Sequence, residues 1–191
     1  HPEALEAAAH YIRKTLEDSG YEVHSQDFES GEMTVQNLEA ELPGGGEPEE
    51  IIILGAHYDS VSGTVGADDN ASGVAVMLET ARAMQAAAGS KAGNLAITYV
   101  AFALEEPPAY GTRFMGSRVF ASSARQAGQT IDGMICLEMV GFTCHEPGCQ
   151  HFPFPLQFLG YPDTGTFIGM VSNLKSLGLA RRLRASFRRN P

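Results

Sequence analysis

One histidine and several carboxylates gather around a short glycine-rich part of the sequence. This part reads Gly-Ala-His-Tyr-Asp-Ser at residues 55–60 and Gly-Ala-Asp-Asp-Asn-Ala-Ser-Gly at residues 66–73. It follows the apolar run at residues 51–54, which predicts a buried strand. Imidazole nitrogen and carboxylate oxygen are ligands that suit zinc and its neighbours in the first transition row. The pattern therefore predicts a metal site at the end of a strand.

His57 and Asp59 form the first part of this candidate site. Two residues at this spacing point to the same side of an extended chain, so one can bind a metal while the other orients it. A buried, hydrogen-bonded histidine is the better explanation of such a pair taken alone. The acidic loop at residues 66–70 reverses that balance, because its carboxylates would repel one another without a cation.

Further acidic residues end two other apolar runs. Glu105 and Glu106 follow the run at residues 95–104, and Glu138 follows the run at residues 134–137. A turn after the first run would let one glutamate bind a metal and the other take a proton from water, as metal-assisted hydrolysis requires. For the glutamate pair taken alone, a solvated acidic loop is the alternative. We expect the three strand ends to converge on one pocket.

The elements that must position these residues alternate between strand and helix. Helical spacing of apolar residues predicts helices at about 3–19, 72–88, 115–126 and 173–188. Strands are predicted at 21–28, 33–42, 51–57, 95–104, 133–138 and 166–171. The aperiodic residues 142–165 predict a long loop. This order predicts an α/β fold, with a mixed, mainly parallel sheet between helices and the working site at the carboxyl ends of the strands.

Length and charge limit the classes of function. The 191 residues are expected to form a single domain, 1–191, and the net charge of −10 argues against a nucleic-acid partner. No apolar run approaches the roughly 20 residues that cross a bilayer, so no membrane span is predicted. Residues 164–191 contain six basic residues and no acidic one. We interpret them as the solvated face of a terminal helix, rather than as a patch for a membrane or nucleic acid.

Three cysteines give an odd count. Cys144 and Cys149 lie in one loop and could close a small disulfide in an oxidising compartment. Cys136 lies in an apolar strand, which predicts a buried thiol. The first residues resemble neither a signal peptide nor a transit peptide.

Four blocks of the sequence, in this order, resemble those of the M28 family of zinc-dependent aminopeptidases: GAHYDS, GADDNASG, ALEEPP and CLEMVG. The resemblance runs from about residue 1 to residue 190 and implies the fold of the co-catalytic zinc exopeptidases. It implies metal ligands at four positions, with two zinc ions in the complete site: His57 on one zinc, Asp69 bridging both, Glu106 on the side of the first, and Glu138 on the second. It also implies Glu105 as the general base, Asp59 as the acid that orients His57, and a cis peptide bond between Asp69 and Asn70.

The sequence departs from the family pattern in two places. Glu138 stands where many members have aspartate, which keeps the carboxylate on a longer arm. A late Ser-Asp-His-type block with a further metal-binding histidine is missing, so either the chain lacks the C-terminal part of the family domain or the second metal site is altered. His145 and His151 are expected to be ordinary surface histidines. We expect the ion beside Glu138 to lack an imidazole, and this chain to bind at most one zinc tightly, with little or no peptidase activity.

The resemblance implies a metal-dependent hydrolase that removes residues from peptides with a free N-terminus, by means of a zinc-bound water and the general base. A glutaminyl-cyclase-like acyltransferase with one zinc is an alternative on the same fold. A binding protein that has lost catalysis is another. The resemblance favours a secreted or periplasmic protein over a cytoplasmic one. Oligomeric state and side-chain preference stay open.

Overall fold

The computed structural model describes residues 2–42, 50–91 and 95–189. They form two compact units, His1–Met139 and Val140–Pro191, which we call the N-terminal unit and the C-terminal unit. Every predicted site residue belongs to the N-terminal unit. That residues 1–191 form one domain stays a prediction.

The helices and strands follow the predicted order. The helices are α1 (Pro2–Asp18), α2 (Gly73–Lys91), α3 (Gly116–Gln126) and α4 (Leu177–Arg189), with short helical segments η1 (Ala67–Ser72), η2 (Leu156–Phe158) and η3 (Leu174–Ser176). The strands are β1 (Val23–Ser30), β2 (Met33–Leu42), β3 (Glu50–His57), β4 (Leu95–Phe102) and β5 (Gly133–Cys136). The strand predicted at 166–171 is wrong. Within the described ranges, residues 166–171 pair with no strand, and the nearest pairing is an isolated bridge between Cys144 and Gly165.

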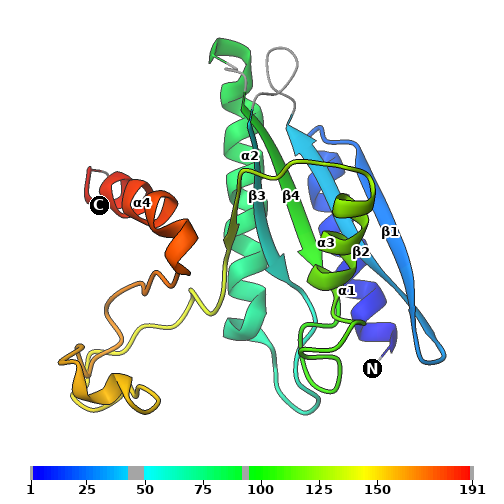
Figure 1. Cartoon of the computed structure of the whole chain (residues 1–191). Helices are drawn as coiled ribbons and strands as arrows, with labels where there is room; N and C mark the ends of the chain where they lie inside the picture. Colours follow the sequence, from blue (N-terminus) through cyan, green and yellow to red (C-terminus); the bar gives the residue numbers. More distant parts are fainter. Residues whose placement is uncertain (1, 43–49, 92–94, 190–191) are drawn as a thin grey trace. The chain divides into compact units, whose positions relative to one another are not determined.

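The five strands form one mixed sheet in the order β1-β2-β4-β3-β5 (Figure 1). β3 pairs in parallel with β4 and with β5, and β2 pairs antiparallel with both β1 and β4. Helices α2 and α3 connect the parallel strands. The carboxyl ends of β3, β4 and β5 therefore lie at the same edge of the sheet, and the predicted α/β fold is confirmed.

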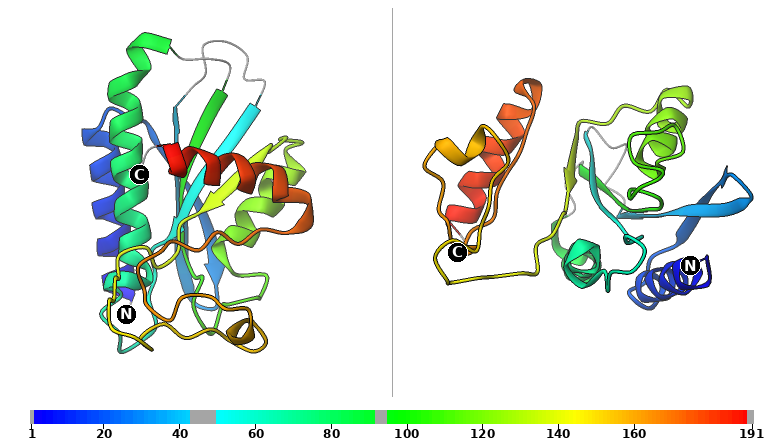
Figure 2. Two further views of the ribbon diagram at one scale, coloured as in Figure 1. Left: turned by 90° about the vertical axis from the view of Figure 1, so that its left-hand side faces the viewer. Right: turned by 90° about the horizontal axis from the view of Figure 1, so that it is seen from below.

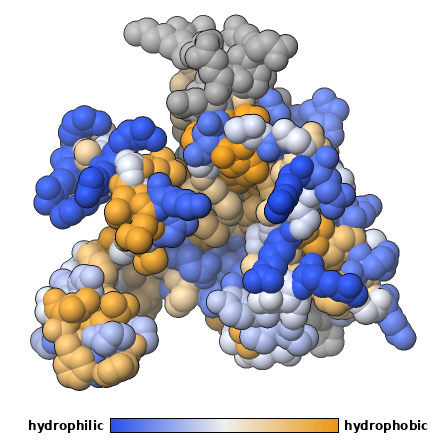
Figure 3. Space-filling view, in the orientation of Figure 1, coloured by the Kyte–Doolittle hydropathy of each residue, from blue (hydrophilic) through white to orange (hydrophobic). Residues whose placement is uncertain are grey.

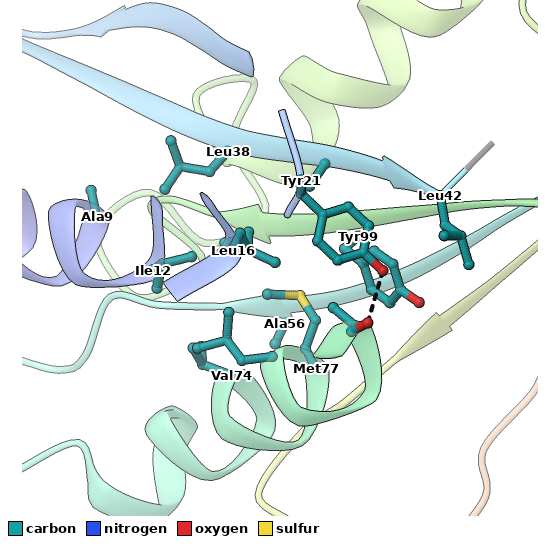
Figure 4. Packing of buried hydrophobic residues seen from close by; sticks show 14 residues of the cluster. Ala9, Ile12, Leu16, Tyr21, Leu38, Leu42, Ala56, Val74, Met77 and Tyr99 are labelled. Atoms are coloured by element: carbon teal, nitrogen blue, oxygen red, sulfur yellow. Dashed lines mark hydrogen bonds between the residues drawn. The ribbon is translucent and has the colours of Figure 1, made fainter. Parts of the chain in front are cut away.

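Helices cover both faces of the sheet. In the right-hand view of Figure 2, α1 and α2 lie on one side and α3 lies on the other. The larger core lies under α1 and α2, where Leu16, Leu38, Met77 and Tyr99 are almost fully buried (Figure 4). Burial of each such side chain contributes roughly 1.5–3 kcal/mol. The hydroxyl of Tyr21 donates to the Ala81 carbonyl at 2.8 Å, which joins the end of α1 to α2 across this core.

The face under α3 carries the smaller core and the site. Ile53, Val100, Phe102 and Phe120 form this cluster. Side chains alternate along a strand, so His57 points to the same face as Ile53. Between them, a Cβ atom on Gly55 would lie 2.5 Å from Cε2 of Phe102. The ring of Phe102 therefore requires glycine two residues before the histidine.

In the C-terminal unit, a long irregular segment is followed by α4. Cys144 and Cys149, whose pairing the sequence left open, are joined by a disulfide. Apolar side chains gather on the irregular segment, and hydrophilic ones cover much of α4 (Figure 3). His145 and His151 are both exposed. Among the helices that the structure describes, none has the length and apolar character of a membrane span.

The prediction that Cys136 is a buried thiol is wrong, because its side chain is exposed. It belongs to β5, which is the last strand of the described sheet and pairs there with β3 alone. A side chain on an outer strand has fewer neighbours than one on a central strand, although both lie in apolar runs.

Candidate metal centre

The predicted site residues converge at the carboxyl edge of the parallel strands. His57 is the last residue of β3, Glu105 and Glu106 lie just beyond β4, and Glu138 lies just beyond β5. Asp69 comes from η1, between β3 and α2. The peptide bond between Asp69 and Asn70 is cis, which confirms that prediction.

The two ring nitrogens of His57 face different groups. Nε2 lies 3.1 Å from Oδ1 of Asp69 and 3.4 Å from Oε1 of Glu138. Nδ1 lies 3.1 Å from the carbonyl oxygen of Asp59 and 3.4 Å from its Oδ1 atom. A proton on Nδ1 directed at Asp59 leaves Nε2 with a lone pair, which is the arrangement of a metal-binding histidine.

Electrostatics at the site favour positive charge. Burial, at 2% exposure of the side chain, lowers the pKa of His57, but the Asp59 hydrogen bond and the charges of Glu138, Asp59 and Glu105 outweigh it and raise that pKa to about 9. Burial, together with repulsion from neighbouring carboxylates, raises the pKa values of Glu105, Glu106 and Glu138. A bound cation would relieve this repulsion.

Asp69 supplies the test of whether these residues fit a metal. Its Oδ1 atom is buried, and no hydrogen-bond partner for it is found in the described part of the chain. A buried carboxylate oxygen without a partner is costly. Since this oxygen also faces Nε2 of His57, the donors fit a divalent ion that accepts nitrogen and oxygen ligands.

Two sets of donors share the same histidine. One set is His57, Asp69 and Glu138, and the other is His57, Glu105 and Glu106, with the ligand atoms of each set within 4.8 Å of one another. How the donors are divided between ions stays a prediction, since Glu106 and Glu138 each lie within reach of His57. The structure places Glu138 beside His57. Parallel pairing of β5 with β3 produces this arrangement, since it brings the ends of these two strands together.

Asp59 holds the turn after β4. Its carboxylate accepts hydrogen bonds from the backbone amides of Glu105 at 2.9 Å and Glu106 at 3.0 Å. Burial alone would raise the pKa of Asp59. The hydrogen bonds from His57 and from the two amides outweigh burial, so the pKa of Asp59 lies below its usual value. The left-handed φ of 56° at Leu104 turns the chain just before these amides. One carboxylate thus positions the histidine and both glutamates.

Sequence reasoning did not identify the roles of two buried asparagines. Asn70 entered only as part of the cis bond, and Asn37 not at all. Asn37 accepts a hydrogen bond from the Ala103 amide and donates to the Gly116 carbonyl, so it fixes the backbone that leads to Glu105. In the sequence, the one indication of a role for Asn37 is that a polar residue occupies a core-facing position of β2.

The family of the chain follows from its sequence match. The model of peptidase family M28 matches residues 37–154, which include every donor described above. The chain belongs to peptidase family M28. The recognised blocks, the fold and the family match agree.

Two curated relatives illustrate this membership. "Uncharacterized protein YfbL" of Escherichia coli is 37% identical over 190 residues, which cover 95% of this chain and 56% of YfbL. "Probable zinc metalloprotease Lema_P086240" of Leptosphaeria maculans is 28% identical over 133 residues, or 65% of this chain and 28% of that protein. This M28 chain thus spans about half, or less, of the length of these relatives.

Two solved structures share the fold. A "Zn-dependent exopeptidase" of Parabacteroides distasonis has a TM-score of 0.55 and 22% identity, over 71% of this chain and 53% of the other. The glutaminyl cyclase of Porphyromonas gingivalis has a TM-score of 0.60 and 30% identity, over 71% of this chain and 51% of the other. The M28 fold is therefore common to exopeptidases and cyclases.

Proposed function

We propose that the protein is a zinc-dependent aminopeptidase that hydrolyses the first peptide bond of substrates with a free N-terminus. Membership of family M28 supports a metal-dependent peptidase. The observation that carries the proposal is the shared histidine, which brings two sets of carboxylate donors together beside Glu105. The zinc metalloprotease name of one relative supports the choice of metal.

Four side chains are proposed to hold the metal: His57, Asp69, Glu106 and Glu138. A zinc ion bound there would polarise the scissile carbonyl and lower the pKa of a water molecule. Asp59 orients the imidazole of His57 and holds the amides of Glu105 and Glu106. These contacts fix the donors before substrate arrives.

Glu105 is proposed as the general base. Burial and the charges of Asp59 and Asp69 raise its pKa, which moves the carboxylate toward the range useful for proton transfer at neutral pH. It accepts a proton from the attacking water and returns it to the leaving amine, so its protonation state is restored in each cycle. The reaction needs both steps, because an unprotonated amide nitrogen is a poor leaving group.

The test compares two neighbouring glutamates in the protein. Glu105→Gln should lower turnover of an aminoacyl anilide by at least about a hundredfold, with zinc content retained. Glu106→Gln should instead lower zinc affinity, because this residue is a ligand. Elemental analysis after dialysis measures the metal. Full peptidase activity in Glu105→Gln would contradict the assignment.

A glutaminyl-cyclase-like acyltransferase is the second candidate. It is favoured by the likeness to the Porphyromonas gingivalis enzyme and by the single imidazole that the two donor sets share. Peptides with N-terminal glutamine separate the two functions, because a cyclase releases ammonia from them, whereas an aminopeptidase releases the first residue. Ammonia release without release of amino acids would favour the cyclase.

We also infer an oxidising compartment, such as the periplasm or the cell exterior. The bonded pair Cys144 and Cys149 supports this inference, since disulfides persist mainly in such compartments. Fractionation of cells that produce the protein from its natural gene tests it. Recovery of the protein in the cytoplasmic fraction alone would contradict the inference.

A further inference from the structure

We propose that Asn70 is a positioning residue that holds Glu138 and Asp69 at the correct separation around His57. Its significance for metal binding rests on the proposed function above, but the contacts that support it belong to the chain itself. Asn70 lies next to Asp69 in sequence, and its side chain reaches the segment that carries Glu138. One carboxamide therefore links two carboxylates that come from different parts of the fold.

The side chain of Asn70 binds the backbone on both sides of Glu138. Its Nδ2 atom donates to the carbonyl of Leu137 at 2.9 Å, and its Oδ1 atom accepts from the amide of Met139 at 3.2 Å. The residue is only 1% exposed. These two bonds fix the peptide groups that precede and follow Glu138, and so fix the direction in which its side chain leaves the backbone.

Glu138 needs this support because packing does not provide it. Its side chain is 49% exposed, and it follows β5, one of the two edge strands of the described sheet. The next residue, Met139, has a left-handed φ of 45°, which is unusual for a side chain of this size. The hydrogen bond from the Met139 amide to Asn70 holds the backbone in this conformation.

Gly73 gives independent support for the position of the carboxamide. A Cβ atom on Gly73 would lie 2.5 Å from Oδ1 of Asn70 and 2.8 Å from the carbonyl oxygen of Leu137. The Asn70 side chain therefore lies directly against the backbone at the start of α2. Gly73→Ala should displace the carboxamide without changing its chemistry.

A purely structural role for Asn70 must be separated from the positioning role. Oδ1 of Asn70 also accepts from the Gly73 amide at 3.2 Å, as a cap at the start of α2 would. Aspartate and asparagine cap helices about equally well. Asn70→Asp therefore keeps the cap and the bond from Met139, but it loses the donor to Leu137. Its added negative charge would attract a cation, so a loss of metal affinity could not be attributed to charge.

The experiment measures zinc affinity of the full-length protein by calorimetric titration after removal of metal. Asn70→Asp and Gly73→Ala should each bind zinc about tenfold more weakly or worse, which is the usual effect of losing a group that supports a ligand. Asn173→Asp is the control, because the Asn173 side chain also caps a helical segment, accepting from the Ser176 amide at 2.9 Å, and its compact unit contains none of the candidate donors. The zinc affinity of this control should stay within about twofold of wild type.

A double variant tests whether Asn70 acts through Glu138. In the background of Glu138→Ala, the effect of Asn70→Asp on zinc affinity should disappear, because both substitutions act on one ligand.

Three results would overturn the proposal. Folded Asn70→Asp and Gly73→Ala variants with wild-type zinc affinity would leave Asn70 as a helix cap only. An undiminished effect of Asn70→Asp in the Glu138→Ala background would show that Asn70 does not act through Glu138. Loss of the folded state in both variants, measured by circular dichroism, would assign Asn70 to folding alone. A wild-type protein that binds no zinc would differ from all three, since it would contradict the proposed function as well.

Discussion

Two acidic turns at the same edge of the sheet are held in different ways. The central turn, residues 103–106, follows β4, which has a neighbouring strand on each side, and the outer turn, residues 137–139, follows β5. Asp59 holds the central turn with a carboxylate, whereas Asn70 holds the outer turn with a neutral carboxamide. Both turns contain a non-glycine residue with positive φ, Leu104 in the central turn and Met139 in the outer one.

One turn is held by a charged side chain and the other by a neutral one because Asp59 and Asn70 have different neighbours. Asp59 faces His57, whose buried imidazole benefits from a negative charge nearby. Within the described residues, the side chain of Asn70 hydrogen-bonds to backbone amides and a backbone carbonyl, so a neutral group with both a donor and an acceptor suits this position. We therefore expect damage to the central turn to affect both stability and metal binding, and damage to the outer turn to affect mainly metal binding.

Asp59→Ala should have the largest effect. It leaves the amides of Glu105 and Glu106 and the Nδ1 atom of His57 without their carboxylate partner, in a position where the Asp59 side chain is only 10% exposed. We expect a loss of about 3 kcal/mol in the free energy of unfolding without metal, because a buried charge network is broken. Urea unfolding in chelator measures it. Asp59→Asn, which keeps the shape and one acceptor oxygen but removes the charge, should lose less, and equal losses would show that the charge alone, not the shape, holds the turn.

Gly55→Ala should come next, because it crowds the strand that ends at His57. The new methyl group would meet the ring of Phe102, so we expect destabilisation of roughly 1–3 kcal/mol. Phe102→Leu should recover part of this loss in the double variant, with a coupling of at least about 0.5 kcal/mol. Strictly additive losses would mean that Phe102 is not what excludes a larger residue.

Glu138→Ala should leave the metal-free protein nearly as stable as wild type, since half of this side chain is exposed. Zinc at about 100 times its Kd stabilises a protein by about 2.7 kcal/mol, and the variant should lose much of that gain. Thermal unfolding with and without zinc measures the difference. Glu41→Gln, at an exposed position of β2, is the control. A large loss without zinc would contradict the contrast between the two turns.

Labelling of cysteines should show the smallest effect, and it tests the exposure of the outer strand. In the 191-residue chain without reductant, a maleimide should modify Cys136 and neither of the two bonded cysteines. Reduction in denaturant should then give three labelled thiols, as the sequence contains three cysteines. Mass spectrometry of the intact chain counts the labels. An unlabelled native chain would mean that Cys136 is covered in solution.

The sequence by itself determined the order of the elements and the identity of the candidate donors. Apolar residues at helical spacing predicted α1 and α2, and continuous apolar runs predicted the parallel strands, because both patterns are local properties of the chain. The acidic residues that follow each strand were visible for the same reason, since parallel strands bring their carboxyl ends together. The possible pairing of Cys144 with Cys149 was visible because both residues lie in one short loop, but whether they are bonded was decided only by the structure.

Only the tertiary structure decided how the donors are grouped and supported. Pairing of β5 with β3 placed Glu138 beside His57, although 81 positions separate them in sequence. The same pairing placed Cys136 on an outer strand and therefore left it exposed. The hydrogen bonds of Asn70 join residues up to 69 positions apart, and no local pattern encodes a contact at that distance. Donor type is a property of single residues, whereas burial, distance and hydrogen-bond partners depend on the packing of segments that are remote in sequence.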